Sequence, residues 1–125
     1  MFRDDMESYR AKAEAVRLAE VYREEYAIAE CPSDIDSPTV LGAQAANELL
    51  DISGIKASFV LTVYDGRIFL SARSIDEVNV QIIAERLGGG GHINAAGAQF
   101  DHTDVSQVIK MLKGLIDQMI EDGDI

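Results

Sequence analysis

The run of four glycines at residues 88–91 constrains this chain more than any other stretch of its sequence. Glycine has no Cβ, so four in succession allow positive φ and let another group approach the backbone N–H groups closely. A single glycine just after the last turn is enough to end a helix. Two interpretations are open: a backbone cradle for phosphate oxygens with His92 as a neighbouring donor, or a flexible surface loop.

The glycine run lies between a short predicted helix and a short predicted strand. Apolar residues at helical spacing predict a helix over residues 80–87, with Asn79 as its N-cap. A final strand is expected over residues 98–100. The Asp101-His102 pair that follows is a weak metal signal, and we interpret it as a solvated turn.

The clearest sheet signal is a β-hairpin formed by residues 57–64 and 67–73, joined by the turn pair Asp65-Gly66. The first strand is apolar on both faces, which is typical of a central strand. The register predicts these opposite pairs: Tyr64–Arg67, Thr62–Phe69, Val60–Ser71 and Ser58–Arg73. Arg73 therefore leaves the sheet on the Ser58 face, at the end far from the turn.

The N-terminal half of the chain predicts two helices and a second hairpin. Residues 1–18 form a charged helical pattern, whose apolar stripe would be Met6, Tyr9, Ala13 and Val16. Residues 19–22 and 26–31 predict strands, although their turn lacks glycine or asparagine. The alternative is that the first helix continues to Tyr26.

Two of the predicted helices have recognisable starts. Ser37-Pro38 supplies an N-cap and a first-turn proline, and the stripe that follows is Leu41, Ala45, Leu49 and Ile52. Thr103 or Asp104 caps the last helix, whose apolar stripe is Val105, Val108, Ile109, Leu112, Leu115, Ile116 and Met119. These elements predict a single α/β domain, with a mixed sheet of about five strands and helices on both faces.

Charge and composition restrict the ligands that the chain can bind. The formal net charge of −11 argues against tight, sequence-independent binding to long DNA or RNA, but not against a small phosphorylated ligand at a local basic spot. The single cysteine, Cys31, is expected to be a buried thiol. We find no cluster of metal ligands and no apolar run long enough to span a bilayer.

The candidate site residues are Arg73, Ser74, Asn79, Gly89, Gly90, Gly91 and His92. Arg73 ends a strand and Asn79 opens the helix that leads to the glycines, so the guanidinium and the glycine run can converge at one rim of the sheet. A guanidinium fork suits phosphate, and His92 could donate a hydrogen bond. Capping is the favoured role for Asn79, and an ordinary strand-end hydroxyl for Ser74. No pair of nucleophile and base is evident, so no catalytic residue is expected in the chain.

In order and spacing, these motifs resemble the DHH-associated domain of DHH-superfamily phosphoesterases. The motif residues are 71–74, 78–80, 88–92 and 95–97, and the form Gly-Gly-Gly-Gly-His-x-x-Ala-Ala-Gly is far more specific than a lone glycine pair. Residues 55–60 and 79–81 are similar to membrane-anchored cyclic di-AMP phosphodiesterases of the GdpP type. The resemblance covers residues 19–121 in outline.

The resemblance implies that this domain is the C-terminal, substrate-binding lobe of a longer enzyme. Residues 1–18 would be a connector helix from an upstream DHH domain, residues 19–121 the DHH-associated domain, and residues 122–125 an acidic tail. Arg73, Ser74 and Asn79 would lie at the substrate, with residues 89–92 lining the same cleft.

The chain has no Asp-His-His motif. A divalent metal, in this family Mn²⁺, would therefore lie in the upstream domain. The implied ligand is cyclic di-AMP or a short oligonucleotide. The implied location is the cytoplasmic part of a membrane-anchored bacterial protein, with no direct membrane contact by this domain and with homodimerisation open for the parent.

Two other functions remain open. A similar domain occurs in relatives of alanyl-tRNA synthetase, oligoribonucleases and RecJ-like exonucleases, so a nucleic-acid-binding module is the alternative, although the acidic balance weighs against it. A purely structural, dimerising unit would use the glycine run only to let two surfaces approach.

Overall fold

Strands β3 (Ala57–Tyr64) and β4 (Arg67–Ser74) form the centre of the fold. Asp65 and Gly66 both have positive φ, 53° and 73°, as the two central residues of a tight hairpin turn require. The predicted register is confirmed at all four pairs, including Ser58 with Arg73. The computed structural model describes residues 6–31, 38–75 and 78–125.

The other strands extend this hairpin into one mixed sheet of six strands, in the order β1-β2-β3-β4-β6-β5. Strand β2 (Tyr26–Cys31) runs parallel to β3, whereas β1 (Glu20–Tyr22), β6 (Ala95–Asp101) and β5 (Gly90–His92) pair antiparallel to their neighbours. The sheet has one strand more than the expected number, because part of the glycine run itself forms β5.

The turn between β1 and β2 shows how the first hairpin closes without glycine. Arg23 and Glu24 adopt φ values of 51° and 69°, which place them in the left-handed region. Tyr22 pairs directly with Tyr26, so the predicted hairpin is confirmed and the alternative of a helix to Tyr26 is wrong.

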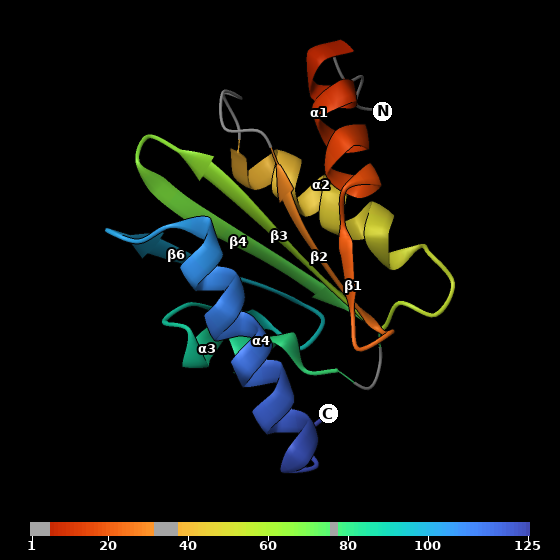
Figure 1. Ribbon diagram of the computed structural model, residues 1–125, viewed down its shortest axis with the longest axis vertical. Helices are drawn as coiled ribbons and strands as arrows, with labels where there is room; N and C mark the ends of the chain where they lie inside the picture. Colours follow the sequence, from red (N-terminus) through yellow and green to blue (C-terminus); the bar gives the residue numbers. More distant parts are fainter. Residues whose placement is uncertain (1–5, 32–37, 76–77) are drawn as a thin grey trace.

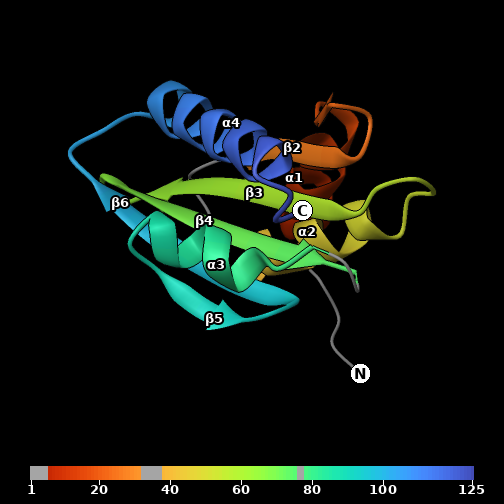
Figure 2. The same cartoon turned by 90° about the horizontal axis from the view of Figure 1, so that it is seen from below.

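Alternating side chains give the sheet two buried faces. One face packs against helices α3 (Val80–Arg86) and α4 (Val105–Glu121), and the other against α1 (Met6–Arg17) and α2 (Pro38–Leu50). Figure 1 shows α4 in front of the sheet and α2 behind it, and Figure 2 shows the strands between them from below. The α/β fold with helices on both faces is confirmed.

The predicted stripe of α1 is wrong. Met6 and Tyr9 are 62% and 58% exposed, and the buried residues of the helix are Ala11, Lys12 and Ala15. Two alanines on the buried face leave room for α1 to pack closely on α2 and β2. At the same contact, Lys12 Nζ lies 3.9 Å from Glu48 Oε1 of α2. The contact of α1 with α2 and β2 is therefore made by small residues. The larger side chains of Met6 and Tyr9, which the sequence predicted at this contact, are exposed.

Helix α2 begins at Pro38 as predicted, while its expected cap, Ser37, lies outside the described residues. Leu41, Ala45 and Leu49 are buried, but Ile52 is 47% exposed because the helix has already ended at Leu50. A Cβ on Gly42 would come within 3.0 Å of the hydroxyl oxygens of Thr62 and Ser71. The absence of a side chain at Gly42 therefore lets α2 lie close against β3 and β4.

Helices α3 and α4 carry the predicted caps. The Asn79 side chain accepts a hydrogen bond from Ile82 N at 3.2 Å, and the Asp104 side chain accepts one from Gln107 N at 2.8 Å, so Asp104 rather than Thr103 caps the last helix. Val108, Leu112, Ile116 and Met119 of α4 are fully buried. The apolar stripe predicted for this helix is confirmed.

Candidate anion-binding site

The sheet register places Arg73 and His92 on the same face. Arg73 of β4 pairs with Ala95 of β6, and Ala95 pairs in turn with His92 of β5. Residues that pair across strands point to the same side of a sheet. Two strand spacings separate the Cα atoms of Arg73 and His92, which is about 10 Å. Arg73 and the glycine run therefore lie on one face of the sheet, the face that carries α2, and line the same concavity.

A concavity of about 650 Å³ lies on this face, where the sheet extends beyond α2. Its floor is made of paired rows of residues, with Ser71, Gly97 and Gly90 in one row and Phe69 and Gln99 in the next. Thr39 and Ala43 of α2 form one wall. The lining residues are Thr39, Ala43, Phe69, Leu70, Ser71, Arg73, Gly88, Gly89, Gly90, Gly91, Ala95, Ala96, Gly97, Ala98 and Gln99.

Arg73 is the cation of this concavity. Its side chain is half-buried, and Nη1 donates a hydrogen bond to the carbonyl of Ala72 at 2.8 Å. Burial lowers the pKa of the Arg73 guanidinium, which nevertheless stays charged. Among the described residues, no carboxylate lies within ion-pair distance of Arg73, whereas Arg67, Arg86 and several other basic residues do have such partners. A partly desolvated cation without a counter-ion is suited to binding an anion.

The glycine run has a defined conformation in which its members differ. Gly88 has a φ of 92° and follows α3, and Gly91 has a φ of 146°. A Cβ on Gly89 would overlap the carbonyl oxygen of Gly97, and one on Gly91 would lie 2.5 Å from Ala96 Cα. Gly90 alone of the four has neither a positive φ nor a neighbour within 4 Å of a Cβ. The fold therefore accounts for three of the four glycines.

Ser74 and Asn79 lie outside the lining of the concavity. The Ser74 hydroxyl is buried, donates to the carbonyl of Val78 at 2.5 Å and accepts from Asn94 Nδ2 at 3.0 Å. Asn79 caps α3. The contact between Ser74 and Asn94 ties the end of β4 to the turn between β5 and β6, whereas Asn79 bonds within the start of α3.

His92 is exposed at the end of β5, beside the concavity and not within its lining. Its side chain shares the face of Arg73 through the register. Because β5 is the last strand of the sheet, His92 stands at the outer rim. A ligand held at Arg73 and extending over β6 would reach it.

The sequence analysis did not single out Phe69 or Gln99 as site residues. Both belong to the lining, and they are direct cross-strand partners. The sequence did contain a signal for Phe69. Because Phe69, Ser71 and Arg73 lie two positions apart along one strand, they share a face of the sheet. What the sequence could not show is that α2 stops short of covering Phe69.

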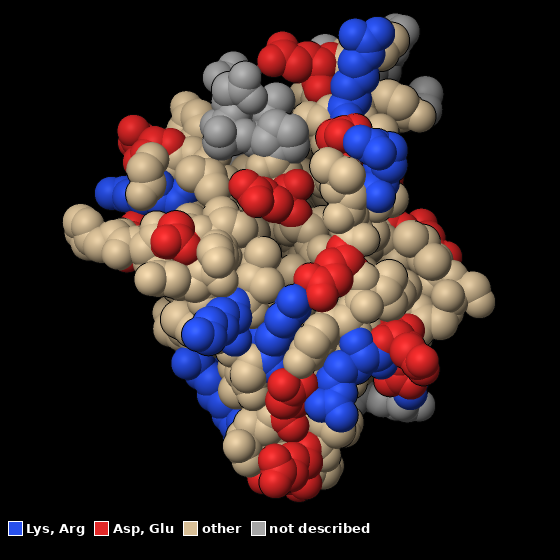
Figure 3. Space-filling view, viewed as in Figure 1, with Lys and Arg blue, Asp and Glu red and all other residues tan. Residues whose placement is uncertain are grey.

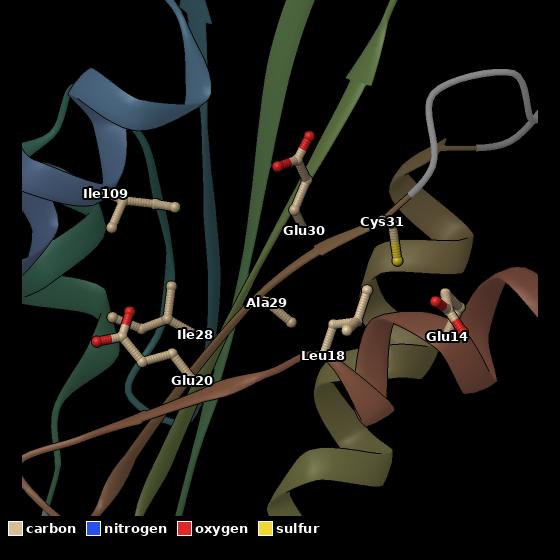
Figure 4. Close-up of a pocket in the computed structure, with 8 residues that line it drawn as sticks. All are labelled: Glu14, Leu18, Glu20, Ile28, Ala29, Glu30, Cys31 and Ile109. Atoms are coloured by element: carbon tan, nitrogen blue, oxygen red, sulfur yellow. The ribbon is translucent and has the colours of Figure 1, made fainter.

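A second concavity, of about 410 Å³, lies beside β2, and its lining includes residues from both faces of the sheet. Figure 4 shows its lining residues coming from α1, β1, β2 and α4. Its charged residues are Glu14, Glu20 and Glu30, which do not converge on one point (Figure 4). Burial raises the pKa of the Cys31 thiol there to about 11. This acidic surface would repel a phosphate.

The face that carries α4 shows no continuous basic surface either. Figure 3 shows Lys and Arg side chains interspersed with Asp and Glu side chains over this face. Several of them form ion pairs, such as Lys113 with Glu20 at 2.8 Å and Arg23 with Asp117 at 2.9 Å. Long nucleic acids need many unpaired cations, and the ion pairs among the described residues reduce the number that this face offers.

The described residues contain no group of three or more His, Cys, Asp or Glu side chains that could hold a metal ion. The resemblance places its divalent metal in an upstream DHH domain, and that expectation stays a prediction. Within the same ranges, no helix is both long and apolar enough to cross a membrane.

Comparison with known proteins identifies relatives over nearly the whole chain. The chain is 38% identical over 116 residues to the cyclic-di-AMP phosphodiesterase PdeA of Listeria monocytogenes, which covers 92% of this chain and 18% of that protein. It is 39% identical over 124 residues to the cyclic-di-AMP phosphodiesterase GdpP of Bacillus subtilis, and this match covers 97% of this chain and 19% of that protein. The chain thus spans about a fifth of the length of these relatives.

Solved structures share the fold at low sequence identity. An exopolyphosphatase-related protein from Bacteroides fragilis matches with a TM-score of 0.80 and 18% identity, over 94% of this chain and 36% of that one. The C-Ala domain of the Aquifex aeolicus alanyl-tRNA synthetase matches with a TM-score of 0.59 and 16% identity, over 77% of this chain and 95% of that one. The family model of the DHHA1 domain matches residues 24–120, and the chain therefore belongs to the DHHA1 domain family.

Proposed function

We propose that this domain is the substrate-binding lobe of a DHH-type phosphodiesterase that hydrolyses cyclic di-AMP or its linear dinucleotide. The observation that carries the proposal is Arg73, a half-buried cation without a carboxylate partner among the described residues, on the same face as the glycine strand β5. The family membership and the two similar cyclic-di-AMP phosphodiesterases support the choice of substrate.

In this proposal the chain binds and orients a phosphodiester. The planar guanidinium of Arg73 donates two parallel hydrogen bonds to phosphate oxygens. Residues 89–91 carry no side chains, so they let the ligand approach the backbone of β5 beside Arg73. His92 donates a further hydrogen bond from the rim. The metal-assisted attack of water belongs to a separate DHH domain.

Calorimetric titration of this chain with cyclic di-AMP and with the linear dinucleotide tests the proposal. Arg73→Ala removes charge-assisted hydrogen bonds worth about 1.5–3 kcal/mol, so we expect affinity to fall about 10- to 150-fold. Arg73→Lys keeps the charge but loses the fork, and should bind with intermediate affinity. Arg10→Ala is the matched control, because it removes the same charge from an exposed position on α1.

Two results would count against the proposal. One is unchanged dinucleotide affinity in a folded Arg73→Ala chain. The other is tighter binding of tRNA than of either dinucleotide at physiological salt, which would favour the nucleic-acid-binding alternative. Circular dichroism of each variant shows whether the fold is retained.

A further inference from the structure

Phe69 is an aromatic residue on a central strand that joins neither buried cluster of the described chain. The ring is half-buried and lines the concavity on the α2 face. Neighbouring side chains on β4, such as Ile68 and Leu70, are 3% exposed and belong to the core on the opposite face. An aromatic face in an open concavity is available for stacking with a flat ligand.

Gln99 stands directly opposite Phe69 on β6. Its side chain is exposed, and its amide nitrogen donates to Asp101 Oδ1 at 3.3 Å. One amide proton and the carbonyl oxygen have no partner among the described residues. Gln99 therefore offers a donor and an acceptor side by side at the edge of the Phe69 ring.

The aromatic and cationic ends of the concavity are separated by a fixed length. Phe69 and Arg73 lie four residues apart on β4, which is about 13 Å at the rise of a strand. A lone phosphate ion can occupy only the Arg73 end. Between the two ends the floor is made of small residues, namely Ser71, Gly97 and Gly90. Such a floor leaves room for a sugar between a phosphate and a flat ring.

We propose that Phe69 and Gln99 form a nucleobase subsite, which takes the adenine of the nucleotide whose phosphate binds at Arg73. The Phe69 ring stacks on the base, and the Gln99 amide accepts from the adenine amino group and donates to N7. This inference rests on the proposed function, since it assumes that the anion at Arg73 belongs to a nucleotide. It assigns to the α2 face a role in recognising the base.

The test separates the base from the phosphate by using 5′-AMP and ribose 5-phosphate as probes. Binding to the isotopically labelled chain is followed by NMR, which also detects weak complexes. Stacking on an aromatic side chain contributes about 1–3 kcal/mol per base, so Phe69→Leu should weaken 5′-AMP binding about 5- to 150-fold and leave ribose 5-phosphate binding unchanged. Tyr9→Leu, at a 58% exposed aromatic residue of α1, is the matched control.

A second variant keeps the test independent of folding effects at Phe69. Gln99→Glu retains the size of an exposed side chain but removes its donor, so we expect weaker 5′-AMP binding, with changes in the spectrum of the free chain confined to the neighbourhood of residue 99. Equal affinity of the wild-type chain for both probes, or wild-type 5′-AMP affinity in both variants, would overturn the base subsite and leave the phosphate site standing. Failure of both probes and of the dinucleotides to bind would overturn the proposed function as well.

Discussion

At the scale of single residues, the glycines around the concavity have different reasons for lacking a side chain. Gly89, Gly91 and Gly97 each lie where a Cβ would collide with backbone, and for Gly97 the obstacle is the Leu70 carbonyl at 2.7 Å. Gly90 faces open space in the row that also contains Gly97 and Ser71. The collision with backbone explains why Gly89, Gly91 and Gly97 must lack a side chain. No such collision exists at Gly90, so its lack of a side chain points to a ligand that approaches it.

This difference predicts opposite outcomes for alanine substitutions. Gly90→Ala should fold normally but weaken dinucleotide binding, because its methyl group would project into the ligand space. Gly97→Ala should lower the free energy of unfolding by about 1–3 kcal/mol, because β4 and β6 must move apart. Gly114→Ala, in the exposed middle of α4, is the control and should stabilise the helix by about 0.5–1 kcal/mol.

Urea denaturation and calorimetric titration of the three variants provide the measurements. A Gly90→Ala chain that unfolds as easily as Gly97→Ala would show that Gly90 is also required by the fold. A Gly90→Ala chain with wild-type affinity would remove this residue from the ligand site.

At the scale of elements, one carboxylate joins the first hairpin to the last helix. Asp117 of α4 accepts hydrogen bonds at 2.8 Å from the Tyr22 hydroxyl and at 2.9 Å from Arg23 Nη1. Tyr22 is the last residue of β1, and Arg23 begins the left-handed turn that joins β1 to β2. The hydrogen bonds from Tyr22 and then Arg23 lower the pKa of Asp117, because they favour its ionised form.

The stabilisation by Asp117 should therefore depend on pH with a definite sign. A depressed pKa stabilises the fold above the pKa of the unfolded chain, and this contribution disappears as the pH falls through the folded value. We expect Asp117→Asn to lower the melting temperature at pH 7, and the difference from wild type to vanish in strong acid. Asp51→Asn, at an exposed carboxylate, is the control. A difference that persists unchanged from pH 7 to strong acid would contradict the assignment.

The same elements show which features can be predicted from sequence. The register of β3 and β4 was predictable because Asp65-Gly66 permits only one tight turn, and a tight turn determines every pair that follows. The buried face of α1 was not predictable, because its two alanines and a lysine indicate burial less strongly than the apolar side chains of Met6 and Tyr9 do. Strand β5 was missed because glycine has a low intrinsic preference for strands, and pairing with β6 overrides it.

At the scale of the whole molecule, the sheet order separates the concavity from the N-terminal helix. The concavity lies over β4, β6 and β5, whereas α1 packs at the other side, on α2 and β2. The interpretation of residues 1–18 as a connector to an upstream domain stays a prediction. The chain spans about a fifth of the length of the two cyclic-di-AMP phosphodiesterases to which it is similar.

We therefore expect the chain to bind the dinucleotide without hydrolysing it. Its described residues offer no cluster of three or more metal-ligating side chains, so added Mn²⁺ should yield no product. Chromatography of cyclic di-AMP incubated with the purified chain measures this, with binding by the same preparation as the control for folding. Manganese-dependent hydrolysis that co-purifies with the chain and is lost in Arg73→Ala would show that the domain is itself catalytic.

Strand β4 carries the site on one side and the core on the other, and this has a consequence for how the sequence can change. Phe69, Ser71 and Arg73 alternate with Ile68, Leu70 and Ala72, so inserting or deleting one residue would exchange the two sets. A chain that lost its ligand spacing in this way would also expose its interior to water. Insertions and deletions of one residue in β4 are thus excluded by the need to keep its apolar side chains buried, and this also keeps the spacing of Phe69, Ser71 and Arg73 unchanged.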